Sequence, residues 1–259
     1  MHPPRHWILL RGLTREAAHW GDFAQRLQRA LPGDTVQTLD LPGNGEWHGQ
    51  RSPLTVQGMV QACRRTLAEH PGLHPQQRYH LLAMSLGAMV ATEWARVAPQ
   101  EVAGCVLINT SMRPFSPVHH RLRLQNVPAL LRLGWGWRRA WAAEATILRL
   151  TSNRADERRA VLAEWAAVRM RRPVSPANAL RQLAAAARYR APVGAPKVPV
   201  LLLGSQHDQL VASRCSQTIA QAWQCPLHMH PFAGHDLPLD DPQWVIDGVC
   251  GWLDSREPG

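Results

Sequence analysis

Short apolar runs alternate with amphipathic segments along most of the chain. Runs at residues 7–10, 36–39, 79–84, 102–108, 198–203 and 228–232 have the length and hydrophobicity of buried strands. Apolar positions with helical spacing follow at residues 22–31, 55–69, 86–97, 211–223 and 242–253. Strands that alternate with helices predict a mostly parallel sheet covered by helices on both faces, which is the α/β class.

The pattern changes between residues 111 and 191. This segment contains no convincing strand and is rich in Ala, Arg, Leu and Trp. Helical spacing occurs within it at residues 140–150 and 156–170. The sequence therefore predicts a helical cap at residues 111–191, inserted into an α/β core that comprises residues 1–110 and 192–259.

A serine stands at the junction of a predicted strand and a predicted helix. Ala83 and Gly87, two residues before and two after Ser85, are small, as a tight strand–turn–helix connection requires. The backbone N–H of Leu86, at the start of the helix, would then point at a developing oxyanion. Ser85 is predicted to be a nucleophile; the alternative is a serine that only caps the helix.

Two further residues complete a catalytic set. A serine nucleophile needs a base, and the base needs an acid that orients it. Asp208 follows the strand at 198–203 and His235 follows the strand at 228–232, so both fall at the carboxyl edge of the sheet. Asp236 is the alternative acid, disfavoured because it adjoins His235. The sequence thus predicts a triad of Ser85, Asp208 and His235.

Five ordered motifs resemble those of the α/β-hydrolase superfamily over essentially the whole chain. They lie at residues 10–13 (LRGL), 40–45 (DLPGNG), 83–87 (AMSLG), 204–208 (GSQHD) and 233–235 (AGH). Within the superfamily the chain is most similar to small serine esterases with a helical cap, such as the pimeloyl-carrier-protein methyl ester esterases. The resemblance implies the α/β-hydrolase fold, and an oxyanion hole formed by the backbone N–H groups of Leu13 and Leu86. It also implies that Ser85 attacks, His235 acts as base and then acid, Asp208 orients His235, and no metal or organic cofactor takes part.

The chain departs from the superfamily pattern at three places. Arg11 stands where a histidine usually precedes the glycine after the first matched strand, and Ala83 replaces the first glycine around the serine. Residues 46–47 (EW) follow the Pro-Gly-x-Gly loop where the family usually continues towards a serine. The first matched strand begins near residue 7, so we expect the sheet to lack the two antiparallel edge strands often found in the superfamily.

The formal net charge of +10 is concentrated in the predicted cap. Lys197 is the only lysine, and residues 111–191 contain 16 arginines against four acidic residues, whereas the rest of the chain is slightly acidic. The cap arginines are interpreted either as a solvated helix surface or as a site for an anionic substrate or an acidic acyl-carrier protein. No nucleic-acid recognition motif accompanies the charge, so we expect no nucleic-acid partner.

Other features bear on the pocket and the compartment. Trp20 is predicted to form a wall of the substrate pocket, and Trp135, Trp137, Trp141 and Trp165 either line that pocket or form the core of the cap.

Dispersed cysteines and the lack of a signal peptide predict free thiols and a cytoplasmic location. No apolar run is long enough for a membrane span.

Together these features predict a serine hydrolase that cleaves a small-molecule carboxylic ester or thioester through an acyl-enzyme. Two alternatives stay open. One is a cofactor-free C–C hydrolase or an acyltransferase with the same triad, and the other is a non-catalytic homologue that binds a ligand in its pocket.

Overall fold

A single sheet of six strands forms the centre of the computed structural model, which describes residues 4–69, 77–154 and 158–256. The strand order is β2-β1-β3-β4-β5-β6, and every pairing in it is parallel. The strands are β1 (His6–Leu10), β2 (Thr35–Leu39), β3 (Tyr79–Met84), β4 (Val102–Ile108), β5 (Val200–Ser205) and β6 (Leu227–His230). The predicted α/β architecture is confirmed.

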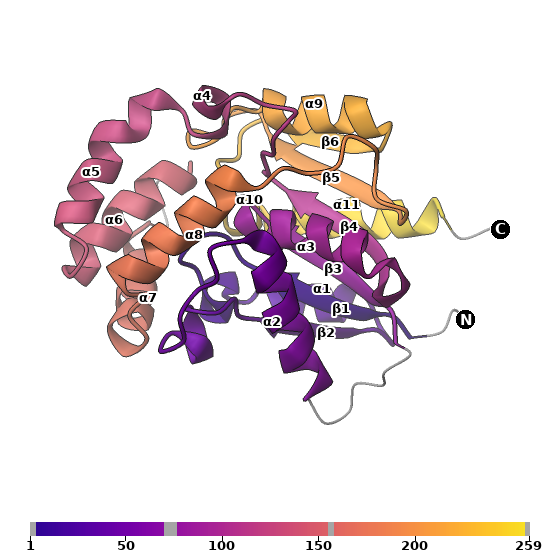
Figure 1. The fold of residues 1–259 in the computed structure, drawn as a ribbon, viewed down its shortest axis with the longest axis horizontal. Helices are drawn as coiled ribbons and strands as arrows, with labels where there is room; N and C mark the ends of the chain where they lie inside the picture. The colour runs from indigo at the N-terminus through magenta and orange to yellow at the C-terminus, as the bar shows by residue number, and fades with distance from the viewer. Residues whose placement is uncertain (1–3, 70–76, 155–157, 257–259) are drawn as a thin grey trace.

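Two hydrophobic clusters cover the two faces of this sheet. Successive residues of a strand point to opposite faces, so Ile8 and Leu10 belong to one cluster while Trp7 and Leu9 belong to the other. The first cluster includes residues of α2 (Val56–Ala68), α3 (Leu86–Val97) and α9 (Arg214–Trp223). The second includes residues of α1 (Phe23–Ala30) and α11 (Pro242–Asp254) (Figure 1). Burial on both faces explains the near-continuous hydrophobicity of the strands.

Some elements differ from the prediction in extent. Helix α9 begins at Arg214 rather than at residue 211, because the backbone N–H groups of Leu210 and Val211 donate to Asp208 Oδ1 in a turn before the helix. The short helices outside the cap are α10 (Leu237–Asp240) and the 3-10 turns η1 (Ala17–Trp20), η2 (Gly45–Trp47) and η3 (Pro99–Glu101). The pattern of apolar residues did not predict them, since a single turn carries too few positions to show a period.

Between β4 and β5, the described residues form helices joined by loops and contain no named strand. The helices are α4 (Val118–Arg121), η4 (Leu124–Asn126), α5 (Val127–Trp135), α6 (Ala140–Thr151), α7 (Arg158–Arg171) and α8 (Pro176–Arg188). Figure 1 shows α5, α6 and α7 grouped beside the sheet and α8 leading back to the core. The helix predicted at 156–170 corresponds to α7, and residues 156–157 lie outside the described residues.

The cysteines are unpaired thiols, as predicted: Cys63, Cys105, Cys215, Cys225 and Cys250. Burial raises the pKa of Cys63 and of Cys105 to about 12, so both stay protonated at neutral pH. Within the described ranges no helix combines the length and the apolar character needed to cross a membrane.

The turns that follow β1 and β3 approach each other very closely. A Cβ added to Gly87 would lie 2.5 Å from the carbonyl oxygen of Leu10 and 2.6 Å from that of Arg11. A Cβ added to Gly12 would lie 3.2 Å from the Cβ of Ser85. Backbone oxygens cannot move aside as the end of a flexible side chain can, so position 87 requires glycine.

We expect Gly87→Ala to lower the free energy of unfolding by about 1–3 kcal/mol, because the added methyl group overpacks the contact with β1. A melting curve followed by circular dichroism measures the effect. Gly251→Ala is the matched control, since position 251 is an exposed helical site with open space around its missing Cβ. There the substitution is expected to be neutral or slightly stabilising. Equal melting temperatures for the two variants would contradict the predicted close contact.

Candidate active site

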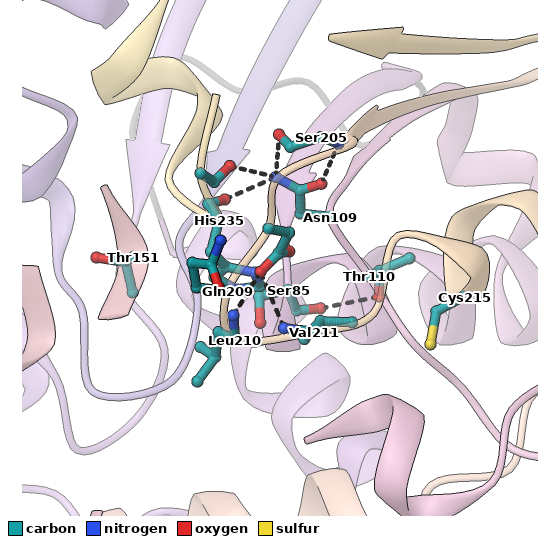
Figure 2. A network of polar contacts seen from close by, with 12 residues as sticks. Ser85, Asn109, Thr110, Thr151, Ser205, Gln209, Leu210, Val211, Cys215 and His235 are labelled. Carbon is teal, nitrogen blue, oxygen red and sulfur yellow. Dashed lines mark hydrogen bonds and ion pairs between the residues drawn. The ribbon is translucent and has the colours of Figure 1, made fainter. Parts of the chain in front are cut away.

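Ser85 occupies a strained turn between β3 and α3. Its φ of 53° and ψ of −114° lie outside the regions that non-glycine residues usually adopt. The Ser85 N–H donates to the Ile108 carbonyl oxygen at 3.0 Å. Thr110 Oγ1 donates to the Ser85 carbonyl oxygen at 3.2 Å (Figure 2). Such a conformation costs about 1–3 kcal/mol and persists only where its surroundings fix it. The turn lifts the Ser85 side chain towards the carboxyl edge of the sheet.

His235 and Asp208 are joined by a short hydrogen bond beside this turn. Nδ1 of His235 lies 2.7 Å from Oδ2 of Asp208, and both side chains are buried. The other carboxylate oxygen, Oδ1, accepts the backbone N–H groups of Leu210 and Val211 at 2.8 and 2.9 Å (Figure 2). Both oxygens of Asp208 are therefore fixed, one by the backbone and one by the imidazole.

The surroundings of His235 favour its protonated form. Burial is the largest influence and disfavours the charged ring, but attraction to Asp208, their hydrogen bond and the charge of Asp236 act in the opposite direction. The net result is a pKa of His235 raised above its ordinary value. An imidazole in this position can accept a proton and hold it.

Asn109 ties the loop of His235 to the ends of two strands. It follows β4 directly and has a φ of 44°. Its Nδ2 donates to the carbonyl oxygens of His235 (2.8 Å) and Gly234 (3.2 Å) and to Ser205 Oγ (2.9 Å), while Oδ1 accepts the Ser205 N–H (Figure 2). Sequence reasoning missed this residue. The sequence feature that could have identified Asn109 is a polar residue at the carboxyl end of a central strand. The same feature identified Asp208.

The predicted oxyanion donors lie on the two turns that contact each other. Leu13 precedes Thr14, whose φ is 58° and whose N–H donates to Gln182 Oε1 of α8 at 2.8 Å. Leu86 is the first residue of α3, so its N–H has no acceptor within the helix. Leu13 and Ser85 line the same cavity.

This cavity has a volume of about 130 Å³, and His235 also lines it. Much of its remaining wall is apolar and comes from the cap and the Asp208 loop: Leu130, Leu133, Trp137, Ile147, Leu150 and Leu210. Sites for drug-sized ligands measure about 300–1,000 Å³, so the cavity suits a small substrate. A larger hollow of about 760 Å³ lies along β2 and α1, but Ser85 and His235 do not line it. We therefore place the candidate site in the smaller cavity.

Comparison with known proteins identifies the family of this chain. Residues 2–242 match the family described as serine aminopeptidase, S33. The chain belongs to this hydrolase family. A relative from Cronobacter turicensis, named as the carbamate hydrolase RutD, is 29% identical over 247 residues, which cover 91% of this chain and 86% of the relative.

Solved structures with a similar fold include three hydrolases from bacteria. The enol-lactonase of Burkholderia xenovorans has a TM-score of 0.74 at 16% identity and covers 98% of this chain and 92% of its own. A protein of Acinetobacter baumannii named as a lipase has a TM-score of 0.76 at 19% identity, over 97% and 84% of the two chains. An esterase of Thermogutta terrifontis has a TM-score of 0.69 at 19% identity, over 98% and 91%. At these identities the likeness establishes the α/β-hydrolase fold alone.

The arginine that replaces the usual histidine has a defined partner in this hydrolase. Arg11 donates to both carboxylate oxygens of Asp236, at 3.0 and 2.5 Å, and both side chains are buried. The guanidinium also lies over the ring of Trp20, 4.8 Å from its centre. Asp236, which sequence reasoning weighed as the alternative acid, is thus held by Arg11 rather than by His235.

The predicted pocket residue Trp20 does not line the cavity of this hydrolase; it lines the larger hollow along β2 and α1. Its ring is buried and stacks on Phe23, 5.3 Å between ring centres, in the second hydrophobic cluster. Of the cap tryptophans, Trp137 lines the cavity, Trp165 is buried beneath the guanidinium of Arg15, and Trp135 is 97% exposed. The spacing of apolar residues could not show which of these tryptophans face the cavity, the interior or solvent. That outcome depends on how the cap helices pack on the core, which is set by contacts between residues distant in sequence.

The cap is hydrogen-bonded to each of the three core loops that carry candidate site residues. One bond reaches the turn after Leu13, one the turn of Asp208, and one the loop of His235. These bonds are Thr14 N–H to Gln182 Oε1 (2.8 Å), Arg123 Nη1 to the Asp208 carbonyl oxygen (2.8 Å), and Asp236 N–H to the Thr151 carbonyl oxygen (2.6 Å).

We expect Asp236→Ala to lower the free energy of unfolding of this hydrolase by about 3–5 kcal/mol, because it leaves the Arg11 guanidinium buried without a carboxylate. Urea unfolding measures this. The double variant Arg11→Met/Asp236→Ala should recover much of the loss, since neither charge remains. Arg26→Ala removes the half-exposed partner of Asp22 and should change stability by less than about 1 kcal/mol. A loss below about 1 kcal/mol for Asp236→Ala would refute the structural role of the pair.

Proposed function

We propose that this hydrolase cleaves small carboxylic esters or thioesters through an acyl-enzyme on Ser85. The observation that carries the proposal is the 2.7 Å contact between His235 and Asp208, on an imidazole that shares a small, largely apolar cavity with a serine in a strained turn. Nucleophile, base and orienting acid in this relation are the requirements of acyl transfer by serine.

The reaction proceeds in two halves. Ser85 Oγ attacks the acyl carbon while His235 accepts its proton, and the backbone N–H groups of Leu13 and Leu86 stabilise the negative oxygen of the tetrahedral intermediate. His235 then gives the proton to the leaving alcohol or thiol. Water, activated by the same imidazole, releases the acid from Ser85. Asp208 keeps the Nδ1 proton of His235 in place and stabilises the imidazolium.

A carbamate is a second candidate substrate class. The same attack, oxyanion and proton transfers apply to its carbonyl group, and the relative from Cronobacter turicensis is named as a carbamate hydrolase. The ester stays the first candidate, and proteins named as an enol-lactonase, a lipase and an esterase share the fold. C–C hydrolysis and acyl transfer use the same triad, so a substrate screen has to include them.

An acidic acyl-carrier protein stays a prediction for the cap. Arg138 and Arg139 are exposed and available to such a partner, whereas Arg169 is buried and bound to Glu144. The arginines of the cap therefore do not all belong to one basic surface.

A fluorophosphonate probe is expected to label the wild-type protein and to leave Ser85→Ala unlabelled, since the probe reacts only with an activated serine. Hydrolysis of short-chain nitrophenyl esters should fall by at least about 10⁴-fold in Ser85→Ala. Ser213→Ala is the matched control, because Ser213 is a partly exposed residue before α9 whose side chain does not cap the helix. Labelling of Ser85→Ala, or no labelling and no hydrolysis by wild type, would refute the proposal.

The acid limb of the pH profile should report His235. The base must be neutral to accept a proton, so kcat/KM is expected to be full above the pKa of His235 and to be lost as pH falls through it. Because the pKa is raised, this limb should lie above pH 6.5.

Replacing Asp208 tests what raises the pKa of His235. Asp208→Asn should lower kcat by about 10⁴-fold and move the limb to lower pH, since the attraction to the imidazolium is lost. Asp241→Asn is the control, because Asp241 contacts a different histidine, His230, at 3.2 Å. A limb that stays in place in Asp208→Asn would show that another group titrates.

A further inference from the structure

Arg15 brings an incompletely paired positive charge to the wall of the candidate active site. Its side chain is 7% exposed, and it lines the cavity together with Ser85 and His235. Nη1 donates to Glu144 Oε2 at 2.6 Å, whereas the buried Nη2 has no acceptor among the described residues. Buried donors in native proteins are nearly always paired. This nitrogen therefore lacks the acceptor that its burial calls for.

Within the trio of Arg15, Arg169 and Glu144 the charges do not balance. Arg15 and Arg169 share the single carboxylate of Glu144, at 2.6 and 2.9 Å, and all three side chains are buried. The other buried guanidinium at the cavity, that of Arg11, is already matched by Asp236. The trio consequently carries one net positive charge in an interior where an unmatched charge is costly. A ligand with one negative charge would balance it.

The side chain of Arg15 is held in a fixed orientation. Its guanidinium lies over the ring of Trp165, 3.9 Å from the ring centre, while Glu144 holds Nη1. Burial lowers the pKa of Arg15, against the attraction of Glu144, and the charge of Arg11 adds to the lowering. A planar cation fixed on two sides loses little freedom when it binds an anion, which favours recognition of a carboxylate.

The position of Arg15 indicates which part of a substrate it would meet. Arg15 follows Leu13 by two residues, on the turn predicted to bind the acyl oxygen. Between the polar groups the cavity has an apolar wall, and its volume is about 130 Å³. A short acyl chain that ends in a negative group matches this combination of size, apolar wall and charge.

We infer that Arg15 binds a carboxylate on the acyl part of the substrate, so that the preferred substrates are half-esters or half-thioesters of short dicarboxylic acids. This inference rests on the proposed ester hydrolysis. Arg15 is a specificity-determining residue in this scheme: it contacts the far end of the acyl group and takes no part in the transfer of the proton from Ser85.

The test compares monomethyl glutarate with methyl pentanoate, a neutral ester of similar length. Wild type is expected to show a kcat/KM for monomethyl glutarate at least about 10-fold above that for methyl pentanoate. Arg15→Met should lower this ratio by about 10- to 100-fold, the effect of a lost hydrogen-bonded charge pair. A merely structural role would lower both values together and leave the ratio unchanged.

Arg169→Met is the matched control. It removes the other guanidinium from the same carboxylate, and residue 169 does not line the cavity. The guanidinium of Arg15 stays in place while the trio loses its net positive charge, so the ratio should fall, but by less than in Arg15→Met. Arg15→Met leaves Glu144 balanced by Arg169 alone, so the variant is expected to fold, which a melting curve checks.

Binding without catalysis separates this inference from the proposed function. Saturating glutarate should raise the melting temperature of Ser85→Ala by at least about 2 °C, and it should not raise that of Ser85→Ala/Arg15→Met. Pentanoate should have no such effect on either variant. No preference in wild type, or an unchanged ratio in Arg15→Met, overturns the role of Arg15 while ester hydrolysis stands. If neither of these esters nor a nitrophenyl ester is cleaved, the proposed function fails, and the glutarate shift alone supports or overturns the carboxylate site.

Discussion

The candidate site depends on the close packing of the turn after β1 against the turn between β3 and α3. These strands are neighbours in register, with Leu10 opposite Ala83, so their carboxyl ends meet at the same level of the sheet. Gly87 lets α3 start against the carbonyl oxygens of β1, and the left-handed backbone of Ser85 follows from that start. One steric contact thereby positions the serine relative to the backbone that would bind the oxyanion. Small residues are needed here because the backbone itself fills the space.

The cap supplies hydrogen-bond partners to the loops of the core. Loops at the carboxyl edge of a parallel sheet leave many backbone groups without sheet partners, and in this hydrolase side chains and carbonyl groups of the cap satisfy several of them. Gln182 is fully buried and joins the turn of Thr14 to Asn44 and Ser52, which lie on another core loop. If the cap moved, the polar groups that it hydrogen-bonds would become exposed or would stay buried without a partner. Each buried group left unpaired would cost about 1–3 kcal/mol. The shape of the cavity is therefore coupled to the loops that carry the triad.

Sequence reasoning recovered the features that depend on local pattern. Apolar runs fixed the six strands, and small residues around Ser85 marked the turn, because both leave a signal within a few residues. The order of Asp208 and His235 along the chain placed them at one edge of the sheet, where the structure joins them. Pairings between distant residues left no such signal. Arg11 and Asp236 are 225 positions apart, and only the fold brings the unusual arginine to the acid beside His235. Trp20 is an aromatic residue close to the oxyanion turn in sequence, yet the fold packs it into the second hydrophobic cluster and leaves it out of the cavity that Ser85 lines.

The arginines that give residues 111–191 their excess positive charge fall into two structural groups, one exposed and one buried. Arginines such as Arg138 are exposed to solvent, where each costs little. Arg169 instead enters the interior and meets Arg15 of the core at Glu144. For joining the cap to the core, one arginine and one glutamate would suffice, and a neutral apolar contact would be at least as stable. The second guanidinium adds a desolvation cost, which its contact with an aromatic ring offsets only in part. A buried charge retained at the wall of a cavity, at a cost to stability, is best explained by a ligand that neutralises it.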